Sequence, residues 1–387
     1  MRRRAHLVLA AVLFLSAFVN AFRLWVLEVQ LFPGDDFRMY YSMARVGLKY
    51  GWSRIYDLEL QCLPISPLTE TTFHCPSLNP PPLVLLTVPL AGLPYATAYA
   101  VWVALLFVAV VGMLALCWSR LPQPKLLYAA GALSLFPIAY GLFLGQVTII
   151  ALLGLTLAWR LITEGHHGWA GAALTLCYVK PQVVFLVPLA LIVAGFWRPV
   201  LVWAAAGAAL ALASILILGR HGVEAYLQLS HVALLDELNH VYTVAGIFGQ
   251  NAAVAGVQLG LALAALLAAW RLRGNLDAAI VAGILGSVLA SPYWHLQDYV
   301  LVALAAAAQL SLGPRKVAIL LAASLYVVGS PFLQGVTYVP GLIQVASWQV
   351  LGIIWLGWLV LYALRLCPPS PSREPVQESP RTDLAAM

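Results

Sequence analysis

The chain has 387 residues, of which 62% are hydrophobic and only 9% are charged. Leu- and Ala-rich runs long enough to cross a bilayer recur along most of it, which excludes a soluble globular domain. Only helices and closed barrels satisfy their backbone in lipid, and these runs lack the period-two alternation of a barrel. The sequence therefore predicts an all-α, polytopic transmembrane helical bundle.

Basic residues collect in short turns and segment ends that share one predicted side of the membrane. Because short loops rich in Lys and Arg stay in the cytoplasm, we predict that this side is cytoplasmic. Both termini would then be cytoplasmic, in a protein integral to the cell (inner) membrane. This placement accounts for the basic excess, so nucleic acid is not an expected partner. These residues are Arg2, Arg3, Arg4, Arg120, Lys125, Arg160, Arg198, Arg271, Arg273, Arg315, Lys316 and Arg365.

Residues 1–27 are predicted to form the first transmembrane span, with its apolar stretch near 7–27. Arg2–Arg4 followed by Leu7–Val19 also resembles a signal peptide, and the small residues of Ser16–Ala21 would suit cleavage. We favour an uncleaved span because the alternation of charge along the later loops is consistent with this segment being retained.

Residues 28–82 are predicted to form an outer loop that contains an amphipathic helix beginning near Asp36. At about 100° per residue, one face of this helix is basic and aromatic and suits lipid headgroups. The opposite face would turn toward the ends of the spans. The first face carries Arg38, Arg45, Lys49 and Trp52, and the second carries Asp36, Tyr40, Met43, Gly47 and Tyr50.

Asp35 and Asp36 are the best candidates for chemistry, because a chain with so few charges places these adjacent carboxylates just after its first span. Either one would also suit a plain N-cap of the helix, so that one caps and the other reacts. Together they would suit a hard divalent cation. Two neighbouring ligands do not close a metal site, however, so no metal or other cofactor is expected.

Cys62 and Cys75 share the outer loop, whereas Cys117 and Cys177 lie within apolar segments. An outward-facing loop meets an oxidising compartment, so a Cys62–Cys75 disulfide is predicted. The alternative is that both loop cysteines are free thiols.

Residues 83–366 are predicted to form a multi-span membrane domain, for a total of about 10–12 spans with some broken or re-entrant helices. At about 1.5 Å per residue, 83–118 is too long for one span, so a short element should precede a span at about 96–118. Residues 169–195 are too few for two full crossings, so two short helices meeting at 180–182 are favoured over one kinked span. Further hairpins are predicted at 126–161, 276–312 and 315–364, and a disordered cytoplasmic tail at 367–387.

The turns on the predicted outer side collect Gln, His, Trp and Pro instead of bare positive charge. Irregular backbone at membrane depth persists only where it lines protein or a water-filled cavity. We therefore expect the working site on the outer (periplasmic) face. The outer turns are 141–146, 180–182, 219–240, 248–251, 291–298 and 330–335.

Residues 36–57, DFRMYYSMARVGLKYGWSRIYD, resemble the first-loop signature of glycosyltransferase family 87. This is the polyprenol-phosphate-mannose-dependent mannosyltransferase-like family of the GT-C fold. Similar motifs follow in order, up to about residue 300. The FGQN stretch departs from the Asn-Gln-Ser pattern of the family, so Asn251 is a weaker substrate-binding candidate. The other motifs are a Pro-rich stretch at 79–82, LGQVTIIALL at 144–153, KPQ at 180–182 and SPYWH at 291–295.

The resemblance implies an inverting transferase that moves a sugar, by family mannose, from a polyprenyl-phosphate donor to an acceptor hydroxyl. The family's first-loop aspartate acts as general base and corresponds to Asp36, with Tyr40 beside it as a substrate-binding candidate. The family's histidine corresponds to His295, which would bind the donor phosphate, orient Asp36, or simply lie at the interface. The expected partners are this donor, a lipid or glycan acceptor, and membrane lipids.

Lys180 is the best candidate for binding the leaving phosphate, since a cation at the depth of the outer leaflet is costly and usually has a partner or a function. The alternative is a lysine that snorkels from a helix break to the interface. Arg220 is a second phosphate candidate. Asp298 would pair with or orient His295, and Gln146 would bind sugar hydroxyls or satisfy the backbone at its turn.

The rival function is that of a multi-pass transporter or lipid flippase, with polar groups or broken helices at the bilayer midplane. A membrane scaffold whose first loop binds a partner is a third reading. Polar groups gathered on one face after a long first loop favour the enzyme. The chain also lacks a phosphate-binding G-x-x-x-x-G-K-[ST] loop, which argues against ATP-driven transport by this chain alone.

Overall fold

The computed structural model describes residues 2–27, 34–62, 77–235, 239–312 and 342–365. Within these residues every regular element is helical and none is a strand, which confirms the predicted all-α class. Among them, four helices are long and apolar enough to cross a membrane, and a bent pair would make five. Shorter apolar helices accompany these, and the total of about 10–12 crossings stays a prediction.

The amino-terminal part begins with one long helix, which is followed by several short ones. α1 (Arg2–Phe22) runs into a π-helical turn, η1 (Arg23–Leu27), and occupies the predicted first span. A short element does precede a span near 96–118, as expected, because α4 and η5 end before α5 begins. These elements are α2 (Asp35–Tyr50), η3 (Trp52–Arg54), α3 (Leu58–Gln61), α4 (Pro81–Thr87), η5 (Val88–Leu90) and α5 (Tyr95–Cys117).

The remaining described elements run from α6 to α18, and many of these helices are interrupted. Of the predicted outer turns, 330–335 lies outside the described residues, as does the tail at 367–387. The elements are α6 (Lys125–Leu133), α7 (Phe136–Leu144), α8 (Thr148–Thr163), α9 (His167–Leu174), η6 (Thr175–Val179), η7 (Pro181–Val183), α10 (Leu186–Val193), α11 (Trp197–Leu235), α12 (Val244–Phe248), α13 (Ala252–Arg271), α14 (Leu276–Ala290), η9 (Leu296–Leu301), α15 (Val302–Gln309) and α18 (Leu342–Arg365).

Two of these interruptions matter for the site. α6 and α7 are bent by 49° at a short break. η6 and η7 are separated by Lys180, whose backbone (φ −153°, ψ 70°) is not helical. Pro181 explains this second break, because a proline disfavours the helical conformation of the residue before it. The predicted pair of short helices meeting at 180–182 is therefore present.

α14 lies at the centre of the bundle. It packs against α10, α13, α15 and α18, and nearly all of its side chains are buried. A Cβ atom on Gly283 would lie 2.7 Å from the Cα of Val187, so only a residue without a side chain lets α14 approach α10 this closely. Small residues are the usual means by which membrane helices pack tightly.

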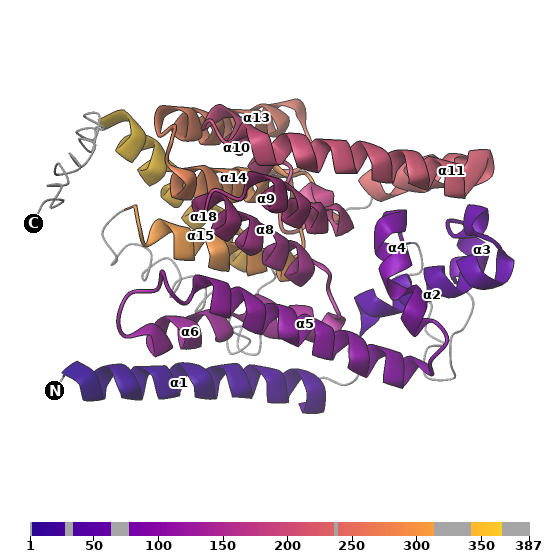
Figure 1. Ribbon diagram of the computed structural model, residues 1–387, viewed down its shortest axis with the longest axis horizontal. Coiled ribbons are helices and arrows are strands. Elements are labelled where there is room, and N and C mark those ends of the chain that lie inside the picture. Colours follow the sequence, from indigo (N-terminus) through magenta and orange to yellow (C-terminus); the bar gives the residue numbers. More distant parts are fainter. Residues whose placement is uncertain (1, 28–33, 63–76, 236–238, 313–341, 366–387) are drawn as a thin grey trace, which may run out of the picture.

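The turns that were predicted to be cytoplasmic meet one another. Arg120 pairs with Asp277 at 3.1 Å, and the backbone N–H of Gly274 donates to Ala194 at 2.9 Å. The outer-loop helices α2, α3 and α4 lie at the opposite end of the long axis from the start of α1 (Figure 1). The two predicted sides thus form two ends of the molecule, and which end faces the cytoplasm stays a prediction.

The start of α2 is fixed against the turn between α7 and α8. The N–H of Gly34 donates to the carbonyl of Phe143 at 2.8 Å, and Trp102 Nε1 donates to the carbonyl of Gly145 at 2.8 Å. Gly145 has a φ of +74°, a left-handed conformation that ends α7. A Cβ atom there would lie 2.7 Å from the Cβ of Phe37 on α2.

We predict that Gly145→Ala destabilises the protein more than Gly165→Ala does. Both glycines have positive φ, which costs alanine about 1–2 kcal/mol, but a Cβ atom on Gly165 would meet nothing within 4 Å. At Gly145 the contact with Phe37 should add about 1–3 kcal/mol. The measurement is thermal unfolding in detergent, and equal losses in the two variants would contradict the packing argument.

Candidate active site

The predicted amphipathic pattern of α2 holds at several positions, but Arg38, expected on the face toward lipid headgroups, has a side chain that is only 12% exposed. Tyr40, Met43 and Gly47 are buried, whereas Arg45 is exposed. Tyr50 was expected to face inward but is 37% exposed, because it is the final residue of the helix and extends beyond the packed region. The buried face directs Asp36 toward the membrane domain.

The carboxylate of Asp36 accepts hydrogen bonds from two amides of distant segments. Gln146, which precedes α8, donates from Nε2 to Asp36 Oδ2 at 2.7 Å. Gln297, in η9, donates to the same oxygen at 3.3 Å. The side-chain oxygen of Gln146, Oε1, in turn accepts hydrogen bonds from the Tyr40 hydroxyl at 3.2 Å and from the backbone N–H of Val147 at 2.8 Å. Three of the predicted site residues are therefore in one hydrogen-bonded group.

Burial raises the pKa of Asp36 to about 7. That value already includes the ammonium of Lys180, which lowers the pKa, the carboxylates of Asp35 and Asp298, which raise it, and the amide of Gln297, which lowers it. A carboxyl group with a pKa near 7 is well suited to accept a proton at neutral pH.

Lys180 and Asp298 form an ion pair inside the protein. Lys180 Nζ lies 2.6 Å from Asp298 Oδ1, and the two side chains are only 6% and 0% exposed. The same oxygen accepts from the Thr148 hydroxyl at 2.5 Å, and Asp298 Oδ2 accepts from the backbone N–H of His295 at 3.1 Å. The helix break thus holds a buried cation, and the charge of this cation lowers the pKa of Asp36.

Asp298 pairs with His295 through a capping box, in which the backbone N–H of Asp298 bonds to the His295 side chain and the Asp298 carboxylate accepts the backbone N–H of His295. The ring nitrogen Nε2 of His295 also lies 3.2 Å from Asn239 Oδ1. Tyr293 lies beside both groups: its ring is 4.8 Å from that of His295 and 5.9 Å from Lys180 Nζ. His295 and Lys180 therefore both lie close to the ring of Tyr293.

Two of the predicted site residues have local roles. Asp35 forms an ion pair with Arg38 one turn further along α2, at 2.9 Å. Asn251 is the N-cap of α13, and its side chain accepts the N–H of Val254 at 2.9 Å.

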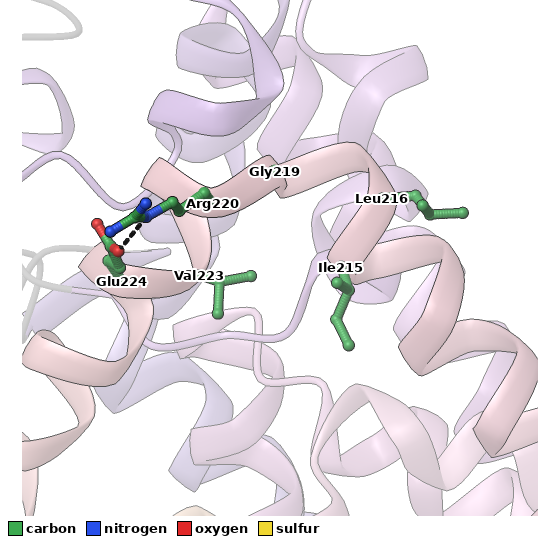
Figure 2. Close-up of a pocket in the computed structure, with 6 residues that line it drawn as sticks. All are labelled: Ile215, Leu216, Gly219, Arg220, Val223 and Glu224. Atoms are coloured by element: carbon green, nitrogen blue, oxygen red, sulfur yellow. Dashed lines mark hydrogen bonds and ion pairs between the residues drawn. The ribbon is translucent and has the colours of Figure 1, made fainter.

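Arg220 lies on α11, just after a kink at Gly219. It pairs with Glu224 one turn later, at 2.7 Å, and its side chain is 91% exposed. Figure 2 shows Arg220 directed toward Glu224 at the edge of a pocket of about 450 Å³. Arg220 therefore makes no hydrogen bond with the group around Asp36. This pocket is lined by Ile215, Leu216, Gly219, Arg220, Val223 and Glu224.

Cys62 is disulfide-bonded, and its predicted partner Cys75 lies outside the described residues, so the pairing stays a prediction. Cys117 and Cys177 are free and buried. Within the described part of the chain, no group of three or more His, Cys, Asp and Glu side chains could hold a metal ion.

Sequence reasoning missed several members of the site. Gln297 is the clearest, because it lies between His295 and Asp298 in a segment already singled out as an outer turn. Thr148 lies within the LGQVTIIALL motif, two residues after Gln146, but a threonine at the start of a helix has no distinctive sequence signal. Asn239 lies in the predicted outer turn 219–240 but in none of the family motifs, and only its position beside His295 reveals it.

Residues 78–292 match the family model of glycosyltransferase family 87. This match covers more than half of the chain, including the turns that contribute Gln146 and Lys180. No curated protein matches the chain, and neither does any solved structure.

We predict that Lys180 and Asp298 are strongly coupled in stability. Lys180→Met or Asp298→Asn alone leaves a buried charge without its partner and should cost about 3–5 kcal/mol. The double variant removes both charges and should lose at least about 1 kcal/mol less than the sum of the two.

The measurement is the free energy of unfolding in detergent for the complete double-mutant cycle. Arg220→Met with Glu224→Gln provides a matched control, because this pair is 91% and 55% exposed and should change stability by less than about 1 kcal/mol. Additive losses at Lys180 and Asp298 would contradict the coupling.

Proposed function

The chain belongs to glycosyltransferase family 87, and on this premise we propose that it transfers a sugar from a polyprenyl-phosphate donor to an acceptor hydroxyl, with Asp36 as general base. The sugar is mannose, the configuration is inverted, and the reaction takes place at the outer face of the membrane. The acceptor is a lipid or a glycan. Family membership favours this transferase over the rival transporter or flippase.

The observation that carries the proposal is the closeness of a proton acceptor and a buried cation. Asp36 is held by amides at 2.7 and 3.3 Å, and Lys180 is close enough to lower its pKa. Base-assisted displacement of a phosphate-linked sugar needs this combination: a carboxylate for the acceptor and a positive charge for the leaving group.

The reaction would proceed as a single displacement at the anomeric carbon. Asp36 takes the proton of the acceptor hydroxyl while that oxygen forms the new bond to the anomeric carbon. The bond from the anomeric carbon to the phosphate oxygen breaks on the opposite side, and its electron pair leaves with the polyprenyl phosphate. The attack from the opposite face inverts the configuration of the sugar.

Lys180 would stabilise the charge that develops on the leaving phosphate. Its ammonium has three N–H groups, and Asp298 is its only hydrogen-bond partner among the described residues. Tyr293 lies beside Lys180, and His295 lies beside Tyr293, so that these two side chains would extend the binding site for the donor. Asp298 then positions the ammonium and offsets its charge before the donor binds.

We predict that Asp36→Asn folds normally but transfers sugar at least about 100-fold more slowly than wild type, because asparagine cannot take a proton. The assay is transfer of radiolabelled mannose from synthetic polyprenyl-phosphate-mannose by purified protein, with a panel of lipid and glycan acceptors. Asp57→Asn is a matched control, since this outer-loop aspartate pairs with Arg54 and His221 instead.

Near-normal turnover by Asp36→Asn would overturn the assignment of the base. Transfer by wild type only from a different polyprenyl-phosphate sugar would replace mannose and leave the role of Asp36 intact.

We also predict a pH dependence of kcat/KM that reports Asp36. The carboxyl group is active when deprotonated, so kcat/KM should fall about tenfold per pH unit below a pKa of about 7 and level off above it. Asp35 raises the pKa of Asp36, so Asp35→Asn should move this acid limb to lower pH. A flat profile between about pH 5 and 8 in wild type would contradict the proposal.

A further inference from the structure

The amide of Gln146 has a fixed orientation. Its oxygen accepts the N–H of Val147 at 2.8 Å, and an N–H group can bond only to the oxygen of an amide. The Tyr40 hydroxyl reaches the same oxygen from α2 at 3.2 Å. The Gln146 nitrogen must therefore point the other way, toward Asp36, and the side chain is only 3% exposed.

This orientation decides which oxygen of Asp36 is available. Oδ2 accepts both amides, from Gln146 at 2.7 Å and from Gln297 at 3.3 Å. No described residue donates a hydrogen bond to Oδ1. Two donors that reach one oxygen from different segments, η9 and the turn before α8, restrict rotation of the carboxylate and leave Oδ1 for another partner.

We propose that Gln146 is a positioning residue for the transfer reaction: its locked amide holds Oδ2 of Asp36 so that Oδ1 takes the proton of the acceptor hydroxyl. This inference rests on the proposed role of Asp36 as general base. It replaces direct sugar binding as the role of Gln146, because both ends of its amide are engaged by the protein.

The position of the Asp36 carboxylate should affect the rate of transfer as much as the presence of the carboxylate does. A catalytic group misplaced by about 1 Å loses on the order of 100-fold in rate, because the reacting atoms no longer meet in line. The amide also bonds the charged form of the carboxylate, which favours the deprotonated base. Removing Gln146 should therefore affect both the rate and its pH dependence, but not the affinity for the donor.

The test is Gln146→Leu, which keeps most of the volume and removes the amide. We expect kcat to fall about 10- to 100-fold, with donor KM within about threefold of wild type. The acid limb of the kcat profile should move up by about one pH unit. Tyr40→Phe removes one of the two bonds that lock the amide, and should show a smaller loss in the same direction.

Gln309→Leu is the matched control. Gln309 is also a buried glutamine, and its oxygen accepts the indole N–H of Trp355 at 3.0 Å, away from Asp36. It should lower the unfolding temperature without moving the acid limb. A purely structural role for Gln146 would give the same pattern as this control and would overturn the inference.

The remaining outcomes separate the two proposals. A raised donor KM with unchanged kcat and pH profile in Gln146→Leu would make Gln146 a sugar ligand and overturn the inference. Normal activity in Gln146→Leu together with an inactive Asp36→Asn would overturn only the positioning role of Gln146. An active Asp36→Asn would overturn Asp36 as the general base, and with it the inference that depends on this role. If Gln146→Leu does not fold, Tyr40→Phe decides, and wild-type kinetics there would overturn the inference.

Discussion

The contact between the start of α2 and the α7–α8 turn determines the geometry of the whole site. Backbone polar groups in a membrane protein must find partners within the protein, because lipid offers none. Here the carbonyl of Phe143 accepts from Gly34 at 2.8 Å and from the Tyr99 hydroxyl at 2.7 Å. The same contacts that satisfy this broken backbone place Asp36 opposite Gln146, so the requirement for hydrogen bonding and the placement of the base have one cause.

A second constraint is the cost of placing charges away from water. Asp298 is completely buried, and it is stable as a charged group only because Lys180, Thr148 and the backbone of His295 all donate to it. Among the described residues, Asp36 accepts side-chain hydrogen bonds from the amides of Gln146 and Gln297 alone. Burial raises its pKa to about 7. The two carboxylates thus have different environments and suit different tasks: one positions a cation, and the other exchanges a proton.

The predicted outer loop is also anchored by α11. α11 contacts η3 and α4, and it is kinked at Gly219, where φ is +60°. His221 lies 2.8 Å from Asp57, and the rings of Tyr56 and Tyr226 are 5.0 Å apart. The segment that carries Asp36 is therefore held at two places, by the α7–α8 turn and by α11, and this makes a loop residue precise enough for chemistry.

Hydropathy, helical period and proline by themselves determined the all-α class, the inward face of α2 with Asp36 and Tyr40, and the break at Lys180, because each depends on residues close in sequence. Only the tertiary structure decided which polar groups meet. Gln146 and Asp36 are 110 residues apart, and Lys180 and Asp298 are 118 apart, so their pairing depends on helix packing that no local pattern encodes. For the same reason Asn251 became a helix cap and Arg220 an exposed ion pair, since each found a nearer partner on its own helix.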